Sequence, residues 1–480
     1  MTRELLDTPD AGPAAVRGGA IRVIGYGAGV LLTVGSAAVL FRHLGVADSG
    51  RYVTVLALMS IVIGVTDIGL TTIGVRELAV RRQSEQRRLM RDLLGLRLTL
   101  SVLGVAIATL FAVVAGYDHE MIVGGIFAGV GVVAASVQAT LGIALMVELR
   151  YGWLTLLDIL RQALLVAGIL ILVAADAGIV PLLALQAPSV LIVLFLTAWL
   201  VRGSVPLLPA FEYGRWRALL REVIPFAAAT IVAAVYFRAS LITLGLVSTD
   251  AETGYFGAAF RVSEVLLLVP GLLVGAAFPI FARAARDDHD RLQYGVDRVF
   301  RASVVLGGLV MVALVLGAQF VIDVVAGPDF GPSAGVLRIQ AAALFLSFAA
   351  TTLFYGMLSL RMHRGILAIA STVLAVNVAL AAILGASHGA TGAAWATVVS
   401  ELAGLVVALA LVARSHRQIV PRLVVVVQVL AAAGAALLIA LVPGLPSVAD
   451  AVIGAGIYAA LALALRVVPP ELLEAFARRR

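Results

Sequence analysis

Two arginines and one glutamate lie inside long apolar stretches of this sequence. Arg238 is the only charged residue of the segment VAAVYFRASLITLG, and Arg261 precedes Glu264 by one helical turn. A charged side chain in an apolar helix is costly, so it usually faces a protein interior or a water-filled cavity. Guanidinium groups bind anionic oxygens through paired hydrogen bonds. We therefore interpret Arg238 and Arg261 as candidate anion ligands in a cavity. The alternatives are an Arg261–Glu264 ion pair, and an Arg238 side chain that extends to the membrane surface or binds a backbone carbonyl.

These two arginines are predicted to share one depth in the membrane. They lie about eight and about seven residues from the ends of two consecutive apolar runs, which at 1.5 Å per residue places both about 10 to 12 Å down. Arg42 and Arg51 border the same predicted outer mouth. Those two either line the cavity or bind lipid headgroups.

Three further residues are candidates for coupling or gating. Asp67, in the segment VTDIG, is a candidate for binding a proton or a sodium ion, and its alternatives are a helix-to-helix hydrogen bond or an inner-end position near Arg76. Glu264 is a second candidate acid, although a carboxylate paired with a neighbouring arginine carries protons poorly at neutral pH. Pro270 follows on the same helix and is expected to kink it.

The composition indicates the kind of element that positions these residues. The chain has 480 residues, of which 62% are hydrophobic and 13% are charged, and its mean hydropathy is +1.07. Apolar runs of roughly twenty residues, the length of a transmembrane helix, recur along it. We therefore predict an all-α polytopic membrane protein with about 14 transmembrane helices. The absence of cysteine excludes disulfides and thiolate metal sites.

The distribution of arginine predicts the orientation in the membrane. Arginines cluster in alternate loops, for example at 76–91 and 283–298, whereas the intervening loops are short and nearly free of them. Positively charged loops face the cytoplasm, so both termini are predicted to be cytoplasmic. The same rule accounts for the net charge of +7, and no basic and aromatic surface indicates a nucleic-acid partner.

An internal repeat predicts two lobes. LGVADSGRY, between the first two spans, resembles LGLVSTDAETGYF, between the seventh and eighth, at an offset of about two hundred residues, as expected for a duplication of six spans. The segment around Trp216, Leu219 and Leu220 is amphipathic and is expected to lie along the inner membrane surface. The predicted division is a cytoplasmic tail 1–19, an N-terminal six-helix lobe 20–202, an amphipathic linker 203–222, a C-terminal six-helix lobe 223–413, two additional helices 414–469 and a basic tail 470–480.

An ordered series of segments resembles one transporter family. FRHLGVADSGRYVTVLALMSIVIGVTDIGL resembles the first hairpin of the oligosaccharide flippases of the multidrug/oligosaccharidyl-lipid/polysaccharide exporter superfamily. GYFGAAFRVSEVLLLVPGLLVGAAFPIFA resembles their eighth span, AGPDFGPSAGVLRIQ the turn into the tenth, and Asn377 with the Gly392 segment the eleventh and twelfth. The resemblance extends over essentially the whole chain.

This resemblance implies a function. Such proteins flip a polyprenyl-pyrophosphate-linked oligosaccharide from the cytoplasmic to the outer leaflet by alternating access, for export of cell-surface polysaccharide. Arg238, Arg261, Arg51 and Arg42 would then face the pyrophosphate and sugars, while Glu264, Asp67 and Pro270 would serve coupling or gating. The lipid bilayer and the lipid-linked glycan are the expected partners, and polysaccharide polymerase or glycosyltransferase proteins are candidate ones.

Three other functions remain open. A lipid II-type flippase is a near relative in the same superfamily. A cation-coupled multidrug antiporter would need a carboxylate in the first or seventh span, where this chain has none, and a cationic cavity repels cationic drugs. A membrane glycosyltransferase or polymerase needs a large outer loop with acid and base groups, and the predicted outer loops are short. We therefore expect a transporter and not an enzyme, with no catalytic residue, no metal and no cofactor.

Overall fold

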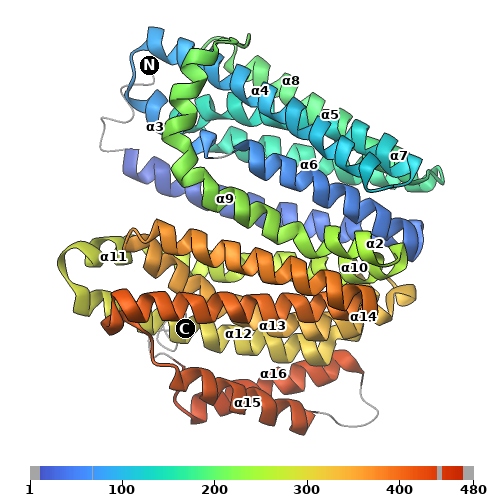
Figure 1. Cartoon of the computed structure of the whole chain (residues 1–480), viewed down its shortest axis with the longest axis vertical. Coiled ribbons are helices and arrows are strands. Elements are labelled where there is room, and N and C mark those ends of the chain that lie inside the picture. Colours follow the sequence, from blue (N-terminus) through green and yellow to red (C-terminus); the bar gives the residue numbers. More distant parts are fainter. Residues whose placement is uncertain (1–10, 68, 441–445, 469–480) are drawn as a thin grey trace. The chain divides into compact units, whose positions relative to one another are not determined.

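The protein is helical throughout the part that the computed structural model describes, which is residues 11–67, 69–440 and 446–468 (Figure 1). Eleven stretches of helix are long and apolar enough to cross a membrane. Two of them, Val34–Val80 and His363–Ser415, are each divided by a non-helical glycine into two segments, and Ile231–Val247 is a shorter apolar helix. These segments match the predicted spans, so the all-α membrane protein with about 14 helices is confirmed.

The chain divides into two compact units, residues 1–238 and 239–480. Helix α9 (Tyr213–Val247) contains the boundary. The other helices of the first unit are α2 (Ala11–Asp67), α3 (Leu70–Val80), α4 (Gln83–Val114), α5 (His119–Val147), α6 (Tyr151–Ala174), α7 (Ile179–Ala184) and α8 (Gln186–Val201). Those of the second are α10 (Asp250–Leu266), α11 (Leu268–Asp287), α12 (His289–Val325), α13 (Pro332–Ser359), α14 (His363–Ser415), α15 (Val424–Ala440) and α16 (Ser447–Ala464), with 3-10 turns at Pro328–Phe330 and Arg417–Ile419. The predicted lobe and linker boundaries stay a prediction.

Single glycines make the turns inside the two longest helices. Gly45 divides α2 with φ 70° and ψ −175°, and Gly389 divides α14 with φ 56° and ψ −135°. Residues other than glycine rarely adopt a backbone conformation with such a positive φ. After the second turn, the Ala390 amide donates to Glu252 Oε2 at 2.7 Å. Glu252 therefore satisfies one of the amides that a helix start leaves without an intrahelical partner.

A cluster of buried aliphatic side chains holds the first unit together. Leu93 and Leu96 of α4 pack with Leu141 and Leu145 of α5, and Leu157 of α6 joins them. Each of these apolar side chains stabilises the fold by about 1.5 to 3 kcal/mol when fully buried. The cluster lies at the α4 end that also carries Asp92 and Arg97, so it holds those charged residues in place.

The start of α9 is docked on this cluster. Trp216 is only 4% exposed and packs within the cluster, so its side chain lies on protein. The position of the linker along the inner membrane surface stays a prediction. The Arg215 guanidinium donates from Nη2 to Asp92 Oδ1 at 2.9 Å, its Nε lies 2.9 Å from Asp92 Oδ2, and Glu212 also contacts it. Ala210 donates its amide to the Arg91 carbonyl at 2.8 Å. The linker is therefore fixed to α4 by both side chains and backbone.

Gly95 is the point of closest approach between α4 and this linker. A Cβ atom there would overlap the Ala210 carbonyl, which is backbone and cannot rotate away. We expect Gly95→Ala to destabilise the first unit by about 1 to 3 kcal/mol because the linker must shift. Thermal unfolding in detergent measures this, and Gly152→Ala is the control because nothing lies within 4 Å of its new methyl group. An Ala210→Cys reporter in the cysteine-free chain should become labelled faster in Gly95→Ala, and equal behaviour of the two glycine variants would contradict the docking.

Helix α12 is the centre of the second unit. It packs against α13, α15 and α16, and the apolar cluster between them includes Phe300, Phe345 and Val429. The Tyr458 hydroxyl of α16 donates to the Val305 carbonyl at 2.8 Å. The two helices predicted to be additional are thus packed onto α12 (Figure 1).

The predicted terminal tails are described only in part. Residues from Ala11 onwards are helical, and the cytoplasmic tail over 1–19 stays a prediction. The basic tail 470–480 and Met1–Asp10 lie outside the described residues.

Candidate functional site

A partly buried ion pair joins α2 to α4 in the first unit, beside a break in the second span. The Arg97 guanidinium of α4 donates from Nη2 to Asp67 Oδ1 at the end of α2. Arg97 Nη1 donates to Thr71 Oγ1 at 3.1 Å, and Thr71 Oγ1 donates to the same Asp67 oxygen at 2.7 Å. The Arg97 side chain is 6% exposed and that of Asp67 is 39% exposed. The arrangement is a guanidinium held inside the protein by a carboxylate that is open to its surroundings on one side.

The helix of the second span ends next to this carboxylate. Helix α2 ends at Asp67 and α3 begins at Leu70, after Gly69 with a left-handed φ of 75°. Backbone that leaves the helix at membrane depth is tolerated only where protein or a water-filled cavity surrounds it. Thr71 and Arg97 bind Asp67 across this break, so the ion pair bridges α2, α3 and α4.

Arg97 was not among the candidate residues predicted from the sequence. Its signal was an arginine in the apolar run LLGLRLTL, with Asp67 as an acid in the preceding span that required a partner. Asp67 therefore forms a helix-to-helix hydrogen bond, which was the first alternative offered for it, and its partner is Arg97. The second alternative, a position near Arg76, does not describe this contact. Arg76 instead donates to Glu77 Oε1, at 2.9 Å from Nη2. The coupling role of Asp67 stays a prediction.

The predicted outer-mouth arginines differ in their surroundings. Arg51 Nη1 lies 3.3 Å from Asp48 Oδ1, and its Nη2 lies 2.9 Å from Asp118 Oδ2 at the start of α5. Arg51 therefore ties α2 to the loop before α5. Arg42 is exposed on α2. Their roles toward a substrate stay predictions.

Arg238 lies in α9 and is partly buried. Its guanidinium carbon lies 5.1 Å from the centre of the Phe237 ring, within the range of a cation–π contact. Arg238 is also the last residue of the first unit. Its predicted pairing with Arg261 on an anion stays a prediction.

Arg261 forms the ion pair that the sequence offered as its alternative. Its Nη1 donates to Glu264 Oε2 at 2.9 Å, within α10. Both side chains are partly exposed, and a guanidinium has five N–H donors in all, so this one bond does not use up those of Arg261. The Ser263 hydroxyl, on a different face of the helix, donates to Gln340 Oε1 at 2.7 Å and fixes α10 on α13.

The helix breaks just before Pro270. Helix α10 ends at Leu266 and α11 begins at Leu268. Proline has no amide hydrogen, so the Leu266 carbonyl cannot receive the usual bond from residue 270. This interruption separates Arg261 and Glu264 from the rest of the predicted eighth span, and it is the feature on which a gating role for Pro270 rests.

A neutral polar cluster lies between α9 and α14 in the second unit. The Ser240 hydroxyl donates to Asn377 Oδ1 at 2.9 Å and lies 3.3 Å from Thr397 Oγ1. Asn377 Nδ2 donates to Ser400 Oγ at 3.2 Å, and Asn377 is fully buried. The cluster joins α9 to both halves of α14, as expected for interhelix bonds of uncharged polar groups.

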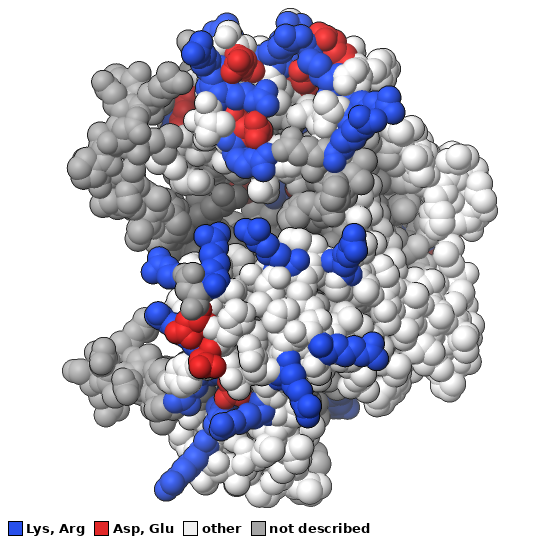
Figure 2. Space-filling view, turned by 60° about the vertical axis from the view of Figure 1, so that its left-hand side comes forward, with Lys and Arg blue, Asp and Glu red and all other residues white. Residues whose placement is uncertain are grey.

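Arginine side chains also gather at the helix ends. Figure 2 shows basic groups, with fewer acidic ones, and a broad area without charge beside them. This distribution suits helices whose middles contact lipid and whose ends meet water. Over the described residues, no group of three or more His, Asp or Glu side chains is placed to hold a metal ion.

Comparisons with known proteins show the family and the fold separately. The profile of the family described as "Polysaccharide biosynthesis protein" matches residues 15–285. The structure of the lipid II flippase MurJ in an inward closed conformation is similar with a TM-score of 0.76 and 13% identity, covering 92% of this chain and 98% of that one. An inward-facing multidrug resistance MATE family transporter of the MOP superfamily has a TM-score of 0.63 and 13% identity, over 80% of this chain and 95% of its own. A point mutant of the Vibrio cholerae MATE transporter VcmN has a TM-score of 0.52 and 11% identity, over 86% of this chain and 100% of its own. A search among curated proteins finds no match.

Proposed function

This chain belongs to the polysaccharide biosynthesis protein family, and we propose that it flips a polyprenyl-pyrophosphate-linked oligosaccharide across the membrane. The direction is from the cytoplasmic to the outer leaflet, by alternating access. The lipid tail can stay in the bilayer during this movement, whereas the sugars and the pyrophosphate cannot cross hydrocarbon unaided. The protein must therefore supply a polar and cationic route for the headgroup.

Arginines held in apolar helices are the observation that carries this proposal. Arg238 lies in α9 and Arg261 in α10, and neither helix has an arginine elsewhere in its apolar part. A pyrophosphate is bound well by guanidinium forks because each fork offers two parallel donors. In our proposal, Arg261 exchanges part of its contact with Glu264 for the substrate, and Arg238 supplies the second cation.

A lipid II-type substrate is the second candidate. It is favoured by the similarity to the lipid II flippase MurJ over most of both chains. Both candidate substrates carry a polyprenyl-pyrophosphate, so the arginines would serve either, and the sugars distinguish them. The similarity to MATE transporters is lower, and the arginines of α9 and α10 do not favour a cationic drug.

The location follows from the same proposal. A flippase for cell-surface glycans works in the bacterial inner membrane, where it receives its substrate from cytoplasmic glycosyltransferases and delivers it to an outer polymerase. Both termini face the cytoplasm in this arrangement, as the arginine-rich loops predict.

Proteoliposomes test the proposed function directly. Fluorescent polyprenyl-pyrophosphate-oligosaccharide is placed in both leaflets, and a membrane-impermeant quencher reports the fraction that reaches the outside. We expect quenching beyond the initial outer-leaflet fraction with the protein and none in protein-free vesicles. Fluorescent lipid II run in parallel decides between the two substrates. Failure to move either lipid, with proton and sodium gradients imposed in turn, would contradict a flippase.

A further inference from the structure

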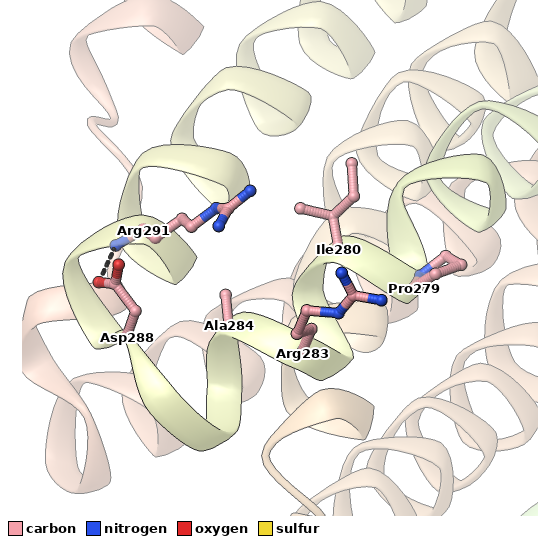
Figure 3. A pocket seen from close by; sticks show the side chains of 6 residues that line it. All are labelled: Pro279, Ile280, Arg283, Ala284, Asp288 and Arg291. Atoms are coloured by element: carbon pink, nitrogen blue, oxygen red, sulfur yellow. Dashed lines mark hydrogen bonds between the residues drawn. The ribbon is translucent and has the colours of Figure 1, made fainter.

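A hollow of about 250 Å³ lies on the hairpin of α11 and α12 (Figure 3). It is open to the surroundings, and all of its lining belongs to the end of α11, the connecting residue and the first turn of α12. The lining residues are Pro279, Ile280, Arg283, Ala284, Asp288 and Arg291. None of them belongs to the proposed substrate route along Arg238 and Arg261.

Two guanidinium groups supply the charge of this hollow. Arg283 and Arg291 are both exposed, and Figure 3 shows their side chains directed to the side on which Ile280 lies. No hydrogen bond or ion pair joins either guanidinium to another side chain that the structure describes. The two arginines therefore present their donors to the hollow.

Asp288 has a different role. Its Oδ1 accepts a hydrogen bond of 2.9 Å from the Arg291 amide, which caps the start of α12 (Figure 3). The carboxylate lies at the helix start, across the hollow from Ile280. This bond fixes the backbone from which Arg291 extends, and it occupies the helix start, so an anion in the hollow would be bound by the arginine side chains.

An apolar wall completes the hollow. Ile280 is 54% exposed and Pro279 is exposed beside it. Pro279 and Ile280 belong to the apolar run GLLVGAAFPIFA, which ends at Ala282 directly before Arg283. The headgroup region of a bilayer is about 5 to 7 Å thick on each side of the hydrocarbon. Ile280 thus lies at the boundary between acyl chains and headgroups, with the arginines at the level of lipid phosphates.

We propose that this hollow binds the phosphate headgroup of an anionic membrane phospholipid. Arg283 and Arg291 hold the phosphate oxygens through charge-assisted hydrogen bonds, while Ile280 and Pro279 contact the glycerol and the first methylenes of the acyl chains. Free phosphate would meet the arginines but not the apolar wall. The ligand is a lipid of the bulk bilayer, bound on the surface of the transporter, and not the transported substrate.

Native mass spectrometry of the full-length protein in detergent tests this site. The probes are phosphatidylglycerol, phosphatidylcholine, glycerol phosphate and polyprenyl pyrophosphate at equal concentration. The variant Arg283→Ala/Arg291→Ala is compared with Arg286→Ala/Arg364→Ala, which removes the same charge from two exposed arginines outside the hollow. We expect the first variant to bind phosphatidylglycerol about tenfold more weakly, as for the loss of one or two charge-assisted bonds, and the second to bind it as wild type does.

Each other result overturns the proposal. An equal loss of phosphatidylglycerol binding in both double variants would show diffuse attraction to a basic surface. Equal binding of glycerol phosphate and phosphatidylglycerol would assign a free-phosphate site. Equal binding of phosphatidylcholine and phosphatidylglycerol would show that the net negative charge of the lipid plays no role. Preference for polyprenyl pyrophosphate would assign the hollow to the substrate.

Should the alanine variant fail to fold, Arg283→Lys/Arg291→Lys replaces it. The expected loss of phosphatidylglycerol binding is then smaller, because lysine keeps the charge but not the planar fork of donors. Ile280→Asn should weaken phosphatidylglycerol but leave glycerol phosphate unchanged.

Discussion

Replacing Asp67 by asparagine is expected to destabilise the first unit by about 3 to 5 kcal/mol, because it leaves a buried guanidinium without its counter-ion. Arg97 is 6% exposed and would keep only the Thr71 hydroxyl and a neutral amide as partners. For a unit of this size, the loss corresponds to a fall of about 6 °C or more in the thermal unfolding midpoint. Differential scanning fluorimetry in detergent measures it.

Substitution of the other partner, Arg97, separates the contributions of the two residues to stability. In Arg97→Met an apolar side chain of similar length fills the site, and Asp67, which is 39% exposed, can still be hydrated. We expect a smaller loss than for Asp67→Asn, and partial recovery in the double variant. Arg76→Ala, which removes an exposed ion pair with Glu77, serves as control and should cost less than about 1 kcal/mol. A loss in Asp67→Asn no larger than in this control would contradict a structural role for the pair, and would strengthen the coupling role predicted for Asp67.

Replacing Gly389 by valine is expected to have the second large effect. A side chain at φ 56° and ψ −135° is strained, which costs about 1 to 3 kcal/mol. The new Cβ would also overlap the Glu252 carboxylate and displace it from the Ala390 amide, at a further cost of about 1 to 3 kcal/mol for the unsatisfied buried group. The thermal unfolding midpoint should therefore fall by several degrees.

Two other glycines provide a graded control for Gly389. Gly45 has a similar positive φ but nothing within 4 Å of a new Cβ, so Gly45→Val retains the strain without the collision. Gly434 lies in α15 with open space around it and no positive φ, and Gly434→Ala should be neutral or slightly stabilising. The expected order of destabilisation is Gly389, then Gly45, then Gly434. Equal effects at Gly389 and Gly45 would show that the contact with Glu252 contributes nothing.

The sequence predicted the helices better than the contacts between them. Apolar runs of about twenty residues are a local property, so the number of spans could be counted. Arg261 and Glu264 were correctly given as a candidate pair because they are one turn apart on a helix. Asp67 and Arg97 are 30 residues apart, and Glu252 and Ala390 are 138 apart. Their contacts depend on how helices pack, which hydropathy does not determine.

Helix interruptions within the predicted spans were predictable only in part. Pro270 indicated the break between α10 and α11, because proline removes a backbone donor wherever it occurs. Gly69 gave no such signal, because glycine is common in transmembrane helices for packing reasons. Trp216 shows a related ambiguity: an amphipathic face predicts burial, but not whether lipid or protein provides it. In this chain, Arg215 and Asp92 direct that face onto α4.

The claim that a cationic route moves a pyrophosphate-linked glycan is tested most directly at Arg238. The measurement is the rate at which fluorescent polyprenyl-pyrophosphate-oligosaccharide becomes quencher-accessible in proteoliposomes containing wild type, Arg238→Ala, Arg238→Lys or Arg202→Ala. Arg202 is an exposed arginine over the Trp199 ring, so it controls for charge. We predict a loss of about tenfold or more for Arg238→Ala, as for one charge-assisted contact, a smaller loss for Arg238→Lys, and wild-type rates for Arg202→Ala, with all four proteins equally folded. Equal rates for wild type and Arg238→Ala would contradict the role given to Arg238 in binding the pyrophosphate.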